Sequence, residues 1–391
     1  MIKAEKTIAI DIRLLGKKRT GDEMVFFHLT KEALKQDRES RYVLLTDETV
    51  AEKLRTLSLR LGCAGQENVG IVSLPAKNRF VWNLFVLPKY LFQNHIDVFH
   101  TQYILPLCVP RRTKIAVHIH DVSFRAHPEL IGWSDRLFLS LFIPRSLRRA
   151  ACVIVPSRFT GDEIVRYYGI DPDKIAVVPN AIGEEFLETV PEDQARDRAT
   201  REKYRLPERF IIAVGTLQPR KNIPFLIEAF ASLRKRLPDM GLVLVGNRAA
   251  RHTDQAIDRA IAAHGLGDAV LFPGFIDQED LPHVIRLATI FALPSLYEGF
   301  GIPMLEAMSQ GVPVAAADIP SLREVGGDAA LYFDVRSDLP SLASCEEKLY
   351  TLCIDQKQRQ MLRSAGKGRV ERYSWKASAT HLLSAYDSVI R

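Results

Sequence analysis

Short runs of β-branched and other apolar residues alternate with longer amphipathic segments from one end of the chain to the other. This alternation favours βαβ units with parallel sheets over a β-sandwich or a helical bundle. In the first half the pattern predicts strands at residues 7–12, 41–46, 97–101, 114–120, 151–157 and 174–180. Helical patterns lie between them, including residues 22–35 and 157–168, and Ser157 fits the capping position of the second of these helices.

The alternation is interrupted once, at residues 183–209. This stretch is polar, first acidic and then basic, with prolines near both ends and no strand pattern, so we expect a domain boundary there. A second series of strands is predicted at residues 210–216, 241–247, 269–275, 289–295, 313–318 and 329–333, and the chain beyond about residue 340 is helical. The fold class is therefore α/β, with two doubly wound parallel-sheet domains. Ligands are expected in a cleft between the domains, at the carboxyl ends of both sheets.

Cysteine usage and the first residues indicate a cytoplasmic protein. The five cysteines are widely scattered and form no C-x-x-C pair, so neither a disulfide framework nor a zinc site is indicated. The chain passes from charged residues straight into a strand-like run that is too short for a signal peptide or a membrane span. The net charge of +6 is usual for a solvated surface, and no nucleic-acid partner is expected.

Basic residues concentrate in one region. Residues 77–149 hold eleven Lys or Arg and four acids, and segments 80–92 and 137–149 place aromatic residues and leucines beside the cations. Such segments are typical of helices that rest on an anionic membrane. They are also typical of ordinary helices that face the core and have a basic outer face, and this second interpretation is favoured because most amphipathic helices are of that kind. Peripheral contact with the inner face of the membrane therefore stays open as the alternative.

The stretch YEGFGIPMLEAMSQG, residues 297–311, predicts an anion-binding turn between a strand and a helix. Pro303 fits the first position of the helix, which offers free N–H groups and partial positive charge to a phosphate. The glycines around Phe300 let the backbone approach a ligand closely. Glu306 is expected in the first helical turn, so that it and Glu298 bracket the turn, as the hydroxyls on both sides of a sugar nucleotide's diphosphate would require. A dinucleotide fingerprint would need glycine at Met304, and no P-loop Gly-Lys-Ser/Thr occurs in the sequence.

Two further groups of residues follow predicted strands. Arg220 and Lys221 lie on a loop after the strand that ends near Gly215, where adjacent cations suit a diphosphate leaving group; a solvated basic loop is the alternative. His118 and His120 alternate along a strand, so both project to one face, with a catalytic and a structural role equally open. No tight ligand cluster accompanies them, and zinc is not expected.

Six segments resemble the family 4 glycosyltransferases, the retaining GT-B group that includes many bacterial mannosyltransferases. In chain order they are HDVSF, VPSRFT, VVPNAI, GTLQPRKN, FPGF and YEGFGIPMLEAMSQGVPVAAADIPSLREV. Their order is the family's usual one, and the likeness covers nearly the whole chain. The loop LLGKKRTGDEM, residues 14–24, departs from the pattern, because many relatives have tandem small residues where this chain keeps Gly16 and Gly21 in a charged loop.

The resemblance implies an acceptor-binding domain over residues 1–185, a donor-binding domain over 205–373, and a last helix from about 374 that crosses back onto the first domain. Glu298 would hold sugar hydroxyls near the anomeric centre, Glu306 the ribose, and Arg220 and Lys221 the diphosphate. His120 would reach the donor sugar from the first domain. The implied catalytic residues are His120, Arg220, Lys221 and Glu298. The implied donor-binding residues are Gly215, Gly274, Phe275, Gly299, Phe300, Gly301, Met304, Leu305 and Glu306, with Gly21 and Asp121 on the acceptor side.

The activity that the resemblance implies is transfer of a hexose, with mannose favoured, from a GDP- or UDP-sugar to a hydroxyl of a glycan or lipid-linked acceptor. The anomeric configuration would be retained, and neither a metal nor another cofactor would be needed. Such reactions belong to polysaccharide or glycolipid assembly. A nucleotide-sugar epimerase or hydrolase of the same fold, and a non-catalytic nucleotide-sugar-binding protein, are the alternatives.

Overall fold

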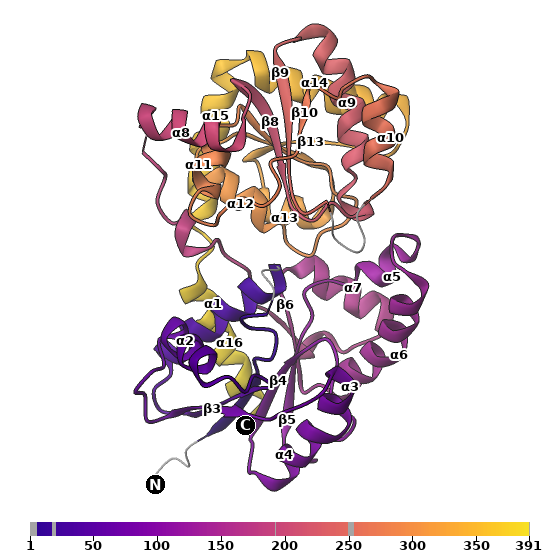
Figure 1. The fold of residues 1–391 in the computed structure, drawn as a ribbon. Helices are drawn as coiled ribbons and strands as arrows, with labels where there is room; N and C mark the ends of the chain where they lie inside the picture. The colour runs from indigo at the N-terminus through magenta and orange to yellow at the C-terminus, as the bar shows by residue number, and fades with distance from the viewer. Residues whose placement is uncertain (1–5, 18–20, 192, 249–253, 391) are drawn as a thin grey trace. The chain divides into compact units, whose positions relative to one another are not determined.

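The computed structural model describes residues 6–17, 21–191, 193–248 and 254–390. The chain folds into two compact units (Figure 1), one reaching Asn180 and including the last segment from Ser374, and the other extending from Ala181 to Tyr373.

The first unit is built on a parallel sheet with the strand order β3-β2-β1-β4-β5-β6-β7. All six predicted strands are present, and β3 was not predicted, because it is a half-exposed run at the sheet edge that contains a glycine. The strands are β1 (Thr7–Asp11), β2 (Arg41–Thr46), β3 (Val69–Ser73), β4 (Val98–Gln102), β5 (Lys114–His118), β6 (Cys152–Val155) and β7 (Ile175–Val177).

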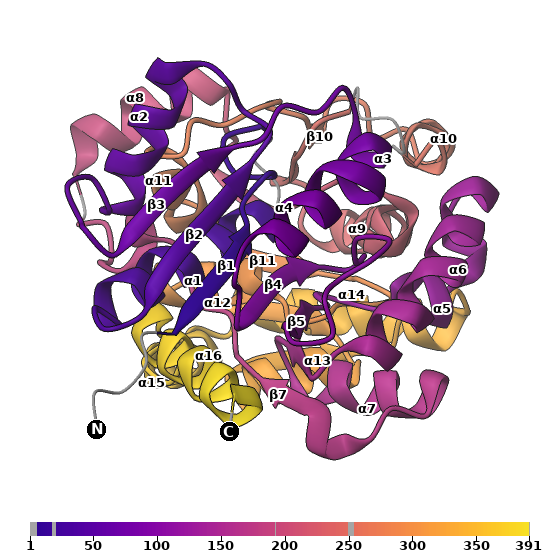
Figure 2. The same cartoon turned by 90° about the horizontal axis from the view of Figure 1, so that it is seen from below.

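Helices cover this sheet, and the last helix of the chain is one of them. Helix α16 (Trp375–Ile390) packs against α1 (Gly21–Gln36), as Figure 2 shows. The side chains of Gln36 and Thr380 are hydrogen-bonded at 2.9 Å, and the Trp375 ring stacks on that of His28. The other helical segments are α2 (Ala51–Leu61), α3 (Arg79–Val81), the π-helical turn η1 (Trp82–Val86), α4 (Leu87–Gln93), α5 (Ser123–Ala126), η2 (Pro128–Leu130), α6 (Trp133–Arg149), α7 (Arg158–Tyr168) and η3 (Pro172–Lys174).

The predicted cap of α7 is confirmed, since the hydroxyl of Ser157 accepts a hydrogen bond from the backbone N–H of Thr160 at 3.1 Å.

The second unit is built on a parallel sheet with the order β10-β9-β8-β11-β12-β13. Its strands are β8 (Arg209–Val214), β9 (Met240–Val245), β10 (Val270–Leu271), β11 (Ile290–Leu293), β12 (Val314–Ala317) and β13 (Ala330–Phe333). Along β8, Phe210 and Ile212 face one apolar core while Ile211 and Ala213 face another. Both faces of the sheet are therefore covered, which confirms the predicted α/β fold class.

The helical segments of the second unit begin in the polar stretch that interrupts the sequence pattern. They are η4 (Glu184–Phe186), α8 (Gln194–Tyr204), η5 (Pro219–Lys221), α9 (Ile223–Arg236), α10 (Ala256–Ala263), α11 (Leu281–Arg286), α12 (Ile302–Ser309), α13 (Pro320–Gly326), α14 (Leu339–Ile354) and α15 (Gln356–Val370). Helix α8 is tied to α11 by an ion pair between Asp197 and Arg286. Among the described residues, no helix combines the length and the apolar content that crossing a bilayer requires.

Candidate active site

The turn before α12 has a backbone conformation that requires glycine. Gly301 has φ = 103°, and a Cβ atom there would lie 2.5 Å from the side chain of Leu322. The helix begins immediately after this residue, at Ile302. Pro303 is therefore its second residue, whereas the sequence had predicted it to be the first. Glu306 is consequently the fifth residue of the helix and opens its second turn, which corrects the prediction that it lies in the first.

Three donors converge on the buried carboxylate of Glu298. Its Oε1 accepts hydrogen bonds from Lys221 Nζ at 2.5 Å and from Ser295 Oγ at 2.6 Å. Its Oε2 accepts from Arg220 Nη1 at 3.1 Å, and Arg220 also donates to the carbonyl of Tyr297. The two cations follow β8 and Glu298 follows β11, and these strands are neighbours in the sheet. The structure thus brings the predicted basic loop and the predicted glycine-rich turn together.

The charges in this cluster compensate one another. Burial by itself raises the pKa of Glu298, but the neighbouring Lys221 and Arg220 outweigh it and lower this pKa to about 2. Glu298 is therefore ionised at neutral pH. Its negative charge is shared by two cations, of which Lys221 is only 8% exposed. One positive charge of the cluster is left in excess, which suits an anionic ligand.

Glu306 has the opposite electrostatic character. It is buried in α12, and this burial, followed by repulsion from Glu185, raises its pKa to about 8. At pH 7 it carries a proton and can both donate and accept a hydrogen bond. The two glutamates of the motif therefore occupy different protonation states, which is typical of carboxyl groups with different tasks at one site.

The remaining predicted donor-side residues fall into two groups. Phe300, Met304 and Leu305 are buried in the core of the second unit, so that only their backbone atoms are available to a ligand. Gly274 has φ = 78°, and the side chain of Phe275 beside it is 71% exposed. Gly215 has φ = 151°. The side chain of Lys221 packs beside this glycine, and a Cβ atom added to Gly215 would lie 3.5 Å from Lys221 Cε.

His120 stands at one end of a row of stacked imidazoles in the first unit, and its side chain is buried like those of His100 and His118. The ring centroids of His118 and His120 are 4.3 Å apart, and those of His100 and His118 are 5.8 Å apart. Burial is the main cause that lowers the pKa of His100 to about 3 and that of His118 well below its usual value, so both are neutral. The Nε2 of His120 lies 2.8 Å from Gln102 Oε1, and its Nδ1 lies 4.0 Å from the carboxylate of Asp22.

The predicted acceptor-side residues are not drawn together by hydrogen bonds. The carboxylate of Asp121 accepts a hydrogen bond from the backbone N–H of Ser123 at 2.9 Å, which stabilises the start of α5. Gly21 is exposed at the first position of α1, and part of the charged loop before it, residues 18–20, lies outside the described residues. Over the ranges that the structure describes, no group of three His, Cys, Asp or Glu side chains could hold a metal ion.

Sequence reasoning missed Ser295 and Gln102. Ser295 precedes Glu298 by three positions at the end of a predicted strand, and Gln102 is the last residue of β4, next to β5 and its histidines. Both are polar residues at the carboxyl end of a strand, which is the signal that could have identified them.

Known proteins match both units. Residues 21–186 match the family model described as Glycosyltransferase Family 4, and residues 196–369 match that described as Glycosyl transferases group 1. The O-antigen chain mannosyltransferase B of Escherichia coli is 30% identical over 284 residues, which cover 71% of this chain and 71% of that enzyme. The serotype-specific mannosyltransferase WbdA of Escherichia coli is 30% identical over 60% of this chain, a match that spans only 28% of that relative.

A solved structure shows the same fold. The crystal structure of HepE from Anabaena in complex with UDP-glucose superposes with a TM-score of 0.71, covering 98% of this chain and 99% of that one at 18% identity. Together with the sequence matches to both units, this likeness shows that the chain belongs to the group 1, family 4 glycosyltransferases and has their GT-B fold.

Proposed function

We propose that the protein is a retaining, metal-independent transferase that moves a hexose from a nucleoside diphosphate sugar to a hydroxyl of a glycan or lipid-linked saccharide. The observation that carries the proposal is the cluster of Glu298, Arg220 and Lys221 beside the start of α12. A diphosphate next to this helix end would meet two cations, and its sugar would meet an ionised carboxylate. Mannose is the sugar we favour, because the Escherichia coli relatives are named mannosyltransferases.

In the proposed reaction, the bond between the anomeric carbon and the diphosphate oxygen breaks while the acceptor oxygen attacks from the same face. The departing phosphate takes the acceptor proton, so that no protein base is needed. Arg220 and Lys221 stabilise the charge that develops on the leaving group, which is the contribution expected of donors fixed in place before the reaction. Glu298 holds the sugar hydroxyls, and His120, in the first unit, is the fourth residue to which we assign a catalytic role.

The other donor-side residues bind the nucleoside. Glu306 binds the ribose diol, and its protonated carboxyl can both donate and accept there. The exposed ring of Phe275 offers a stacking surface to the base.

Replacing Glu306 by Gln is expected to raise the KM for the donor by roughly tenfold with little change in kcat, because the ribose contact is altered and the leaving group is not.

The same substitution should increase the free energy of unfolding at neutral and alkaline pH. The folded-state pKa of Glu306 is about 8, against 4.5 when unfolded, so the wild type loses up to about 1.4 kcal/mol per pH unit as the pH rises through that window. Glutamine escapes this loss. Urea denaturation of both proteins from pH 5 to 9 should show that the free energy of unfolding of the variant increasingly exceeds that of the wild type as the pH rises. A constant difference over this pH range would refute the raised pKa of Glu306.

Product analysis tests the proposed activity against its alternatives. GDP-mannose, GDP-glucose, UDP-glucose and UDP-galactose are each incubated with the enzyme, with and without saccharide acceptors. NMR of the anomeric proton is expected to show a glycoside with the donor's configuration, formed only with acceptor. An altered sugar nucleotide or free hexose without acceptor would instead indicate an epimerase or a hydrolase. Binding of a donor without any product would indicate a non-catalytic protein.

We also propose that one face of the first unit docks on an anionic lipid surface. Helices α4 and α6 do bury residues in the core, as the ordinary interpretation predicts, yet large apolar side chains are exposed on α3, η1, α4 and α6. The exposed fractions are 51% for Phe80, 66% for Phe85 and 80% for Trp133. The ring centroids of Phe80 and Phe138 are 6.1 Å apart, which joins the two segments, and the guanidinium of Arg79, an exposed residue, lies over both rings. Apolar side chains among cations match the chemistry of such a surface.

The double variant Phe85→Ser/Trp133→Ser should bind vesicles of phosphatidylglycerol and phosphatidylcholine at least tenfold more weakly than the wild type in co-sedimentation, because buried apolar area is lost. Leu59→Ser is the control, since Leu59 is also a large exposed apolar residue of the same unit, at 60%, but lies on α2. Wild-type binding should weaken with salt and be absent on pure phosphatidylcholine. Equal binding by the wild type and the double variant would contradict a docking face here.

A further inference from the structure

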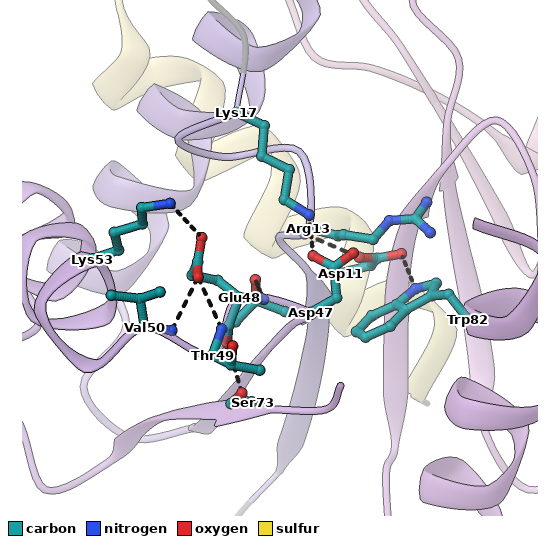
Figure 3. Close-up of polar contacts among 11 residues, drawn as sticks. Asp11, Arg13, Lys17, Asp47, Glu48, Thr49, Val50, Lys53, Ser73 and Trp82 are labelled. Carbon is teal, nitrogen blue, oxygen red and sulfur yellow. Dashed lines mark hydrogen bonds and ion pairs between the residues drawn. The ribbon is translucent and has the colours of Figure 1, made fainter. Parts of the chain in front are cut away.

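A cavity of about 380 Å³ opens in the first unit, at the carboxyl ends of β1, β2 and β4. Its size falls in the range of small-ligand sites, and its place is where open parallel sheets bind ligands. The lining includes the charged residues Asp11, Arg13, Lys17, Asp47 and Arg79. Four of these come from the β1 and β2 loops that Figure 3 draws together. None of them was predicted as a site residue from the sequence.

Arg13 has unused hydrogen-bonding capacity. Its guanidinium lies over the ring of Trp82, 5.4 Å from the centroid, and its buried Nη1 has no hydrogen-bond partner among the described residues. The neighbouring carboxyl of Asp11 does not satisfy it. One oxygen of Asp11 accepts from the backbone N–H of Arg13, and the other accepts from the indole N–H of Trp82 at 3.2 Å. A buried donor without a partner is costly, and a ligand acceptor would relieve that cost.

Arg79 is a second cation in the lining of this cavity. Its guanidinium is held over the rings of Phe80 and Phe138, at 5.1 and 4.9 Å from their centroids. It makes no ion pair within the ranges that the structure describes, whereas Lys17 is paired with Asp47. Apart from the Lys17–Asp47 pair, the lining therefore holds two guanidinium groups and one buried carboxyl, that of Asp11. Burial raises the pKa of Asp11, and the nearby Arg13 opposes this shift. The cavity is complementary to an acidic ligand.

The cavity also adjoins His120. Gln102, which lines it, places its Oε1 2.8 Å from His120 Nε2. Tyr103, another lining residue, adopts φ = 54° and sets its ring 5.6 Å from that of His120. A molecule in this cavity would lie beside the histidine to which we assign a catalytic role.

We propose that this cavity binds an acceptor saccharide that carries an acidic group, a carboxylate or a phosphate, and that Arg13 and Arg79 bind that group. The polar side chains around the aromatic rings would hold the hydroxyls of the sugar. Naming the occupant an acceptor rests on the proposed function, whereas the binding of an acidic saccharide does not.

Isothermal titration or saturation-transfer NMR tests the binding directly, without turnover. The probes are glucuronic acid and mannose 6-phosphate, with methyl mannoside as the neutral sugar. Arg79→Gln and Arg13→Lys should each weaken binding of the acidic sugars by roughly 10- to 100-fold, the usual range for a hydrogen bond to a charged group. Lys77→Gln, two residues before Arg79 and outside the cavity lining, should bind them as the wild type does. The tighter of the two acidic probes identifies the anion.

Two further variants separate this proposal from the proposed function. Asp47→Asn frees Lys17 from its ion pair and should tighten binding of the acidic sugars. Lys221→Ala, in the second unit, should leave this binding unchanged even if it abolishes transfer. If methyl mannoside binds as tightly as the acidic sugars, or if folded Arg79→Gln and Asp47→Asn both bind like the wild type, the inference is overturned.

Discussion

Replacing Lys221 by alanine is expected to lower kcat by about 10² or more, because an ammonium group fixed beside the leaving phosphate stabilises charge that is absent from the ground state. Arg220→Ala should have an effect of the same order. Both side chains reach the carboxylate of Glu298, whose third hydrogen-bond donor, Ser295, is uncharged and cannot replace either cation. Single-turnover kinetics with saturating donor would report the chemical step without the contribution of product release.

A matched control is available in the same unit. Lys235 is exposed near the end of α9, and Lys235→Ala removes the same charge away from the turn before α12. This variant should keep the kcat of the wild type, and circular dichroism should show all three proteins folded. Folded Arg220→Ala and Lys221→Ala proteins with nearly normal turnover would contradict the assignment of these residues to the leaving group.

Glu298→Ala is expected to abolish most activity and also to destabilise the second unit by about 3–5 kcal/mol, since removing one partner of a buried ion pair leaves its charge uncompensated. Lys221 is the residue left behind, at 8% exposed. The loss of activity would follow from two causes, the missing contact to the sugar and the lower stability. Thermal and urea denaturation measure the second cause separately.

A double variant distinguishes the two causes. Glu298→Gln combined with Lys221→Met removes both buried charges, so stability should return to within about 1–2 kcal/mol of the wild type, as replacement of buried ion pairs by apolar residues usually allows. Activity should stay lost, because both charges act on the substrate. Recovery of transfer together with stability would mean that the ion pair has a structural role only.

The fold could be predicted from the sequence because each core strand carries its own signal. The strands of both sheets except β3 were predicted, since they are short apolar runs between helical patterns. The edge strand β3 lacks a continuous apolar run, because its second residue is Gly70 and none of its five residues is buried. The start of α12 was misplaced by one residue because a proline is tolerated at either of the first two positions, and the left-handed conformation of Gly301 decides between them.

The candidate site could be predicted only in part. The basic loop and the glycine-rich turn each follow a strand, but only the sheet order makes β8 and β11 neighbours and brings Lys221 to Glu298. The different protonation states of Glu298 and Glu306 depend on burial and on neighbours distant in sequence, which no local pattern reports. The cavity beside His120 was missed for the same reason, because its lining comes from several loops.

The central claim is that a nucleoside diphosphate binds beside Arg220 and Lys221, and ligand-induced stabilisation tests it most directly. A panel of GDP, UDP, ADP and the matching nucleosides is measured by thermal unfolding with the wild type, Lys221→Ala and Lys235→Ala. One diphosphate at about 100 times its Kd should stabilise the wild type and Lys235→Ala by about 2.7 kcal/mol, with its base identifying the donor. At the same concentration it should stabilise Lys221→Ala far less, and the nucleosides should have little effect. Equal stabilisation of all three proteins, or none by any diphosphate, would contradict the claim.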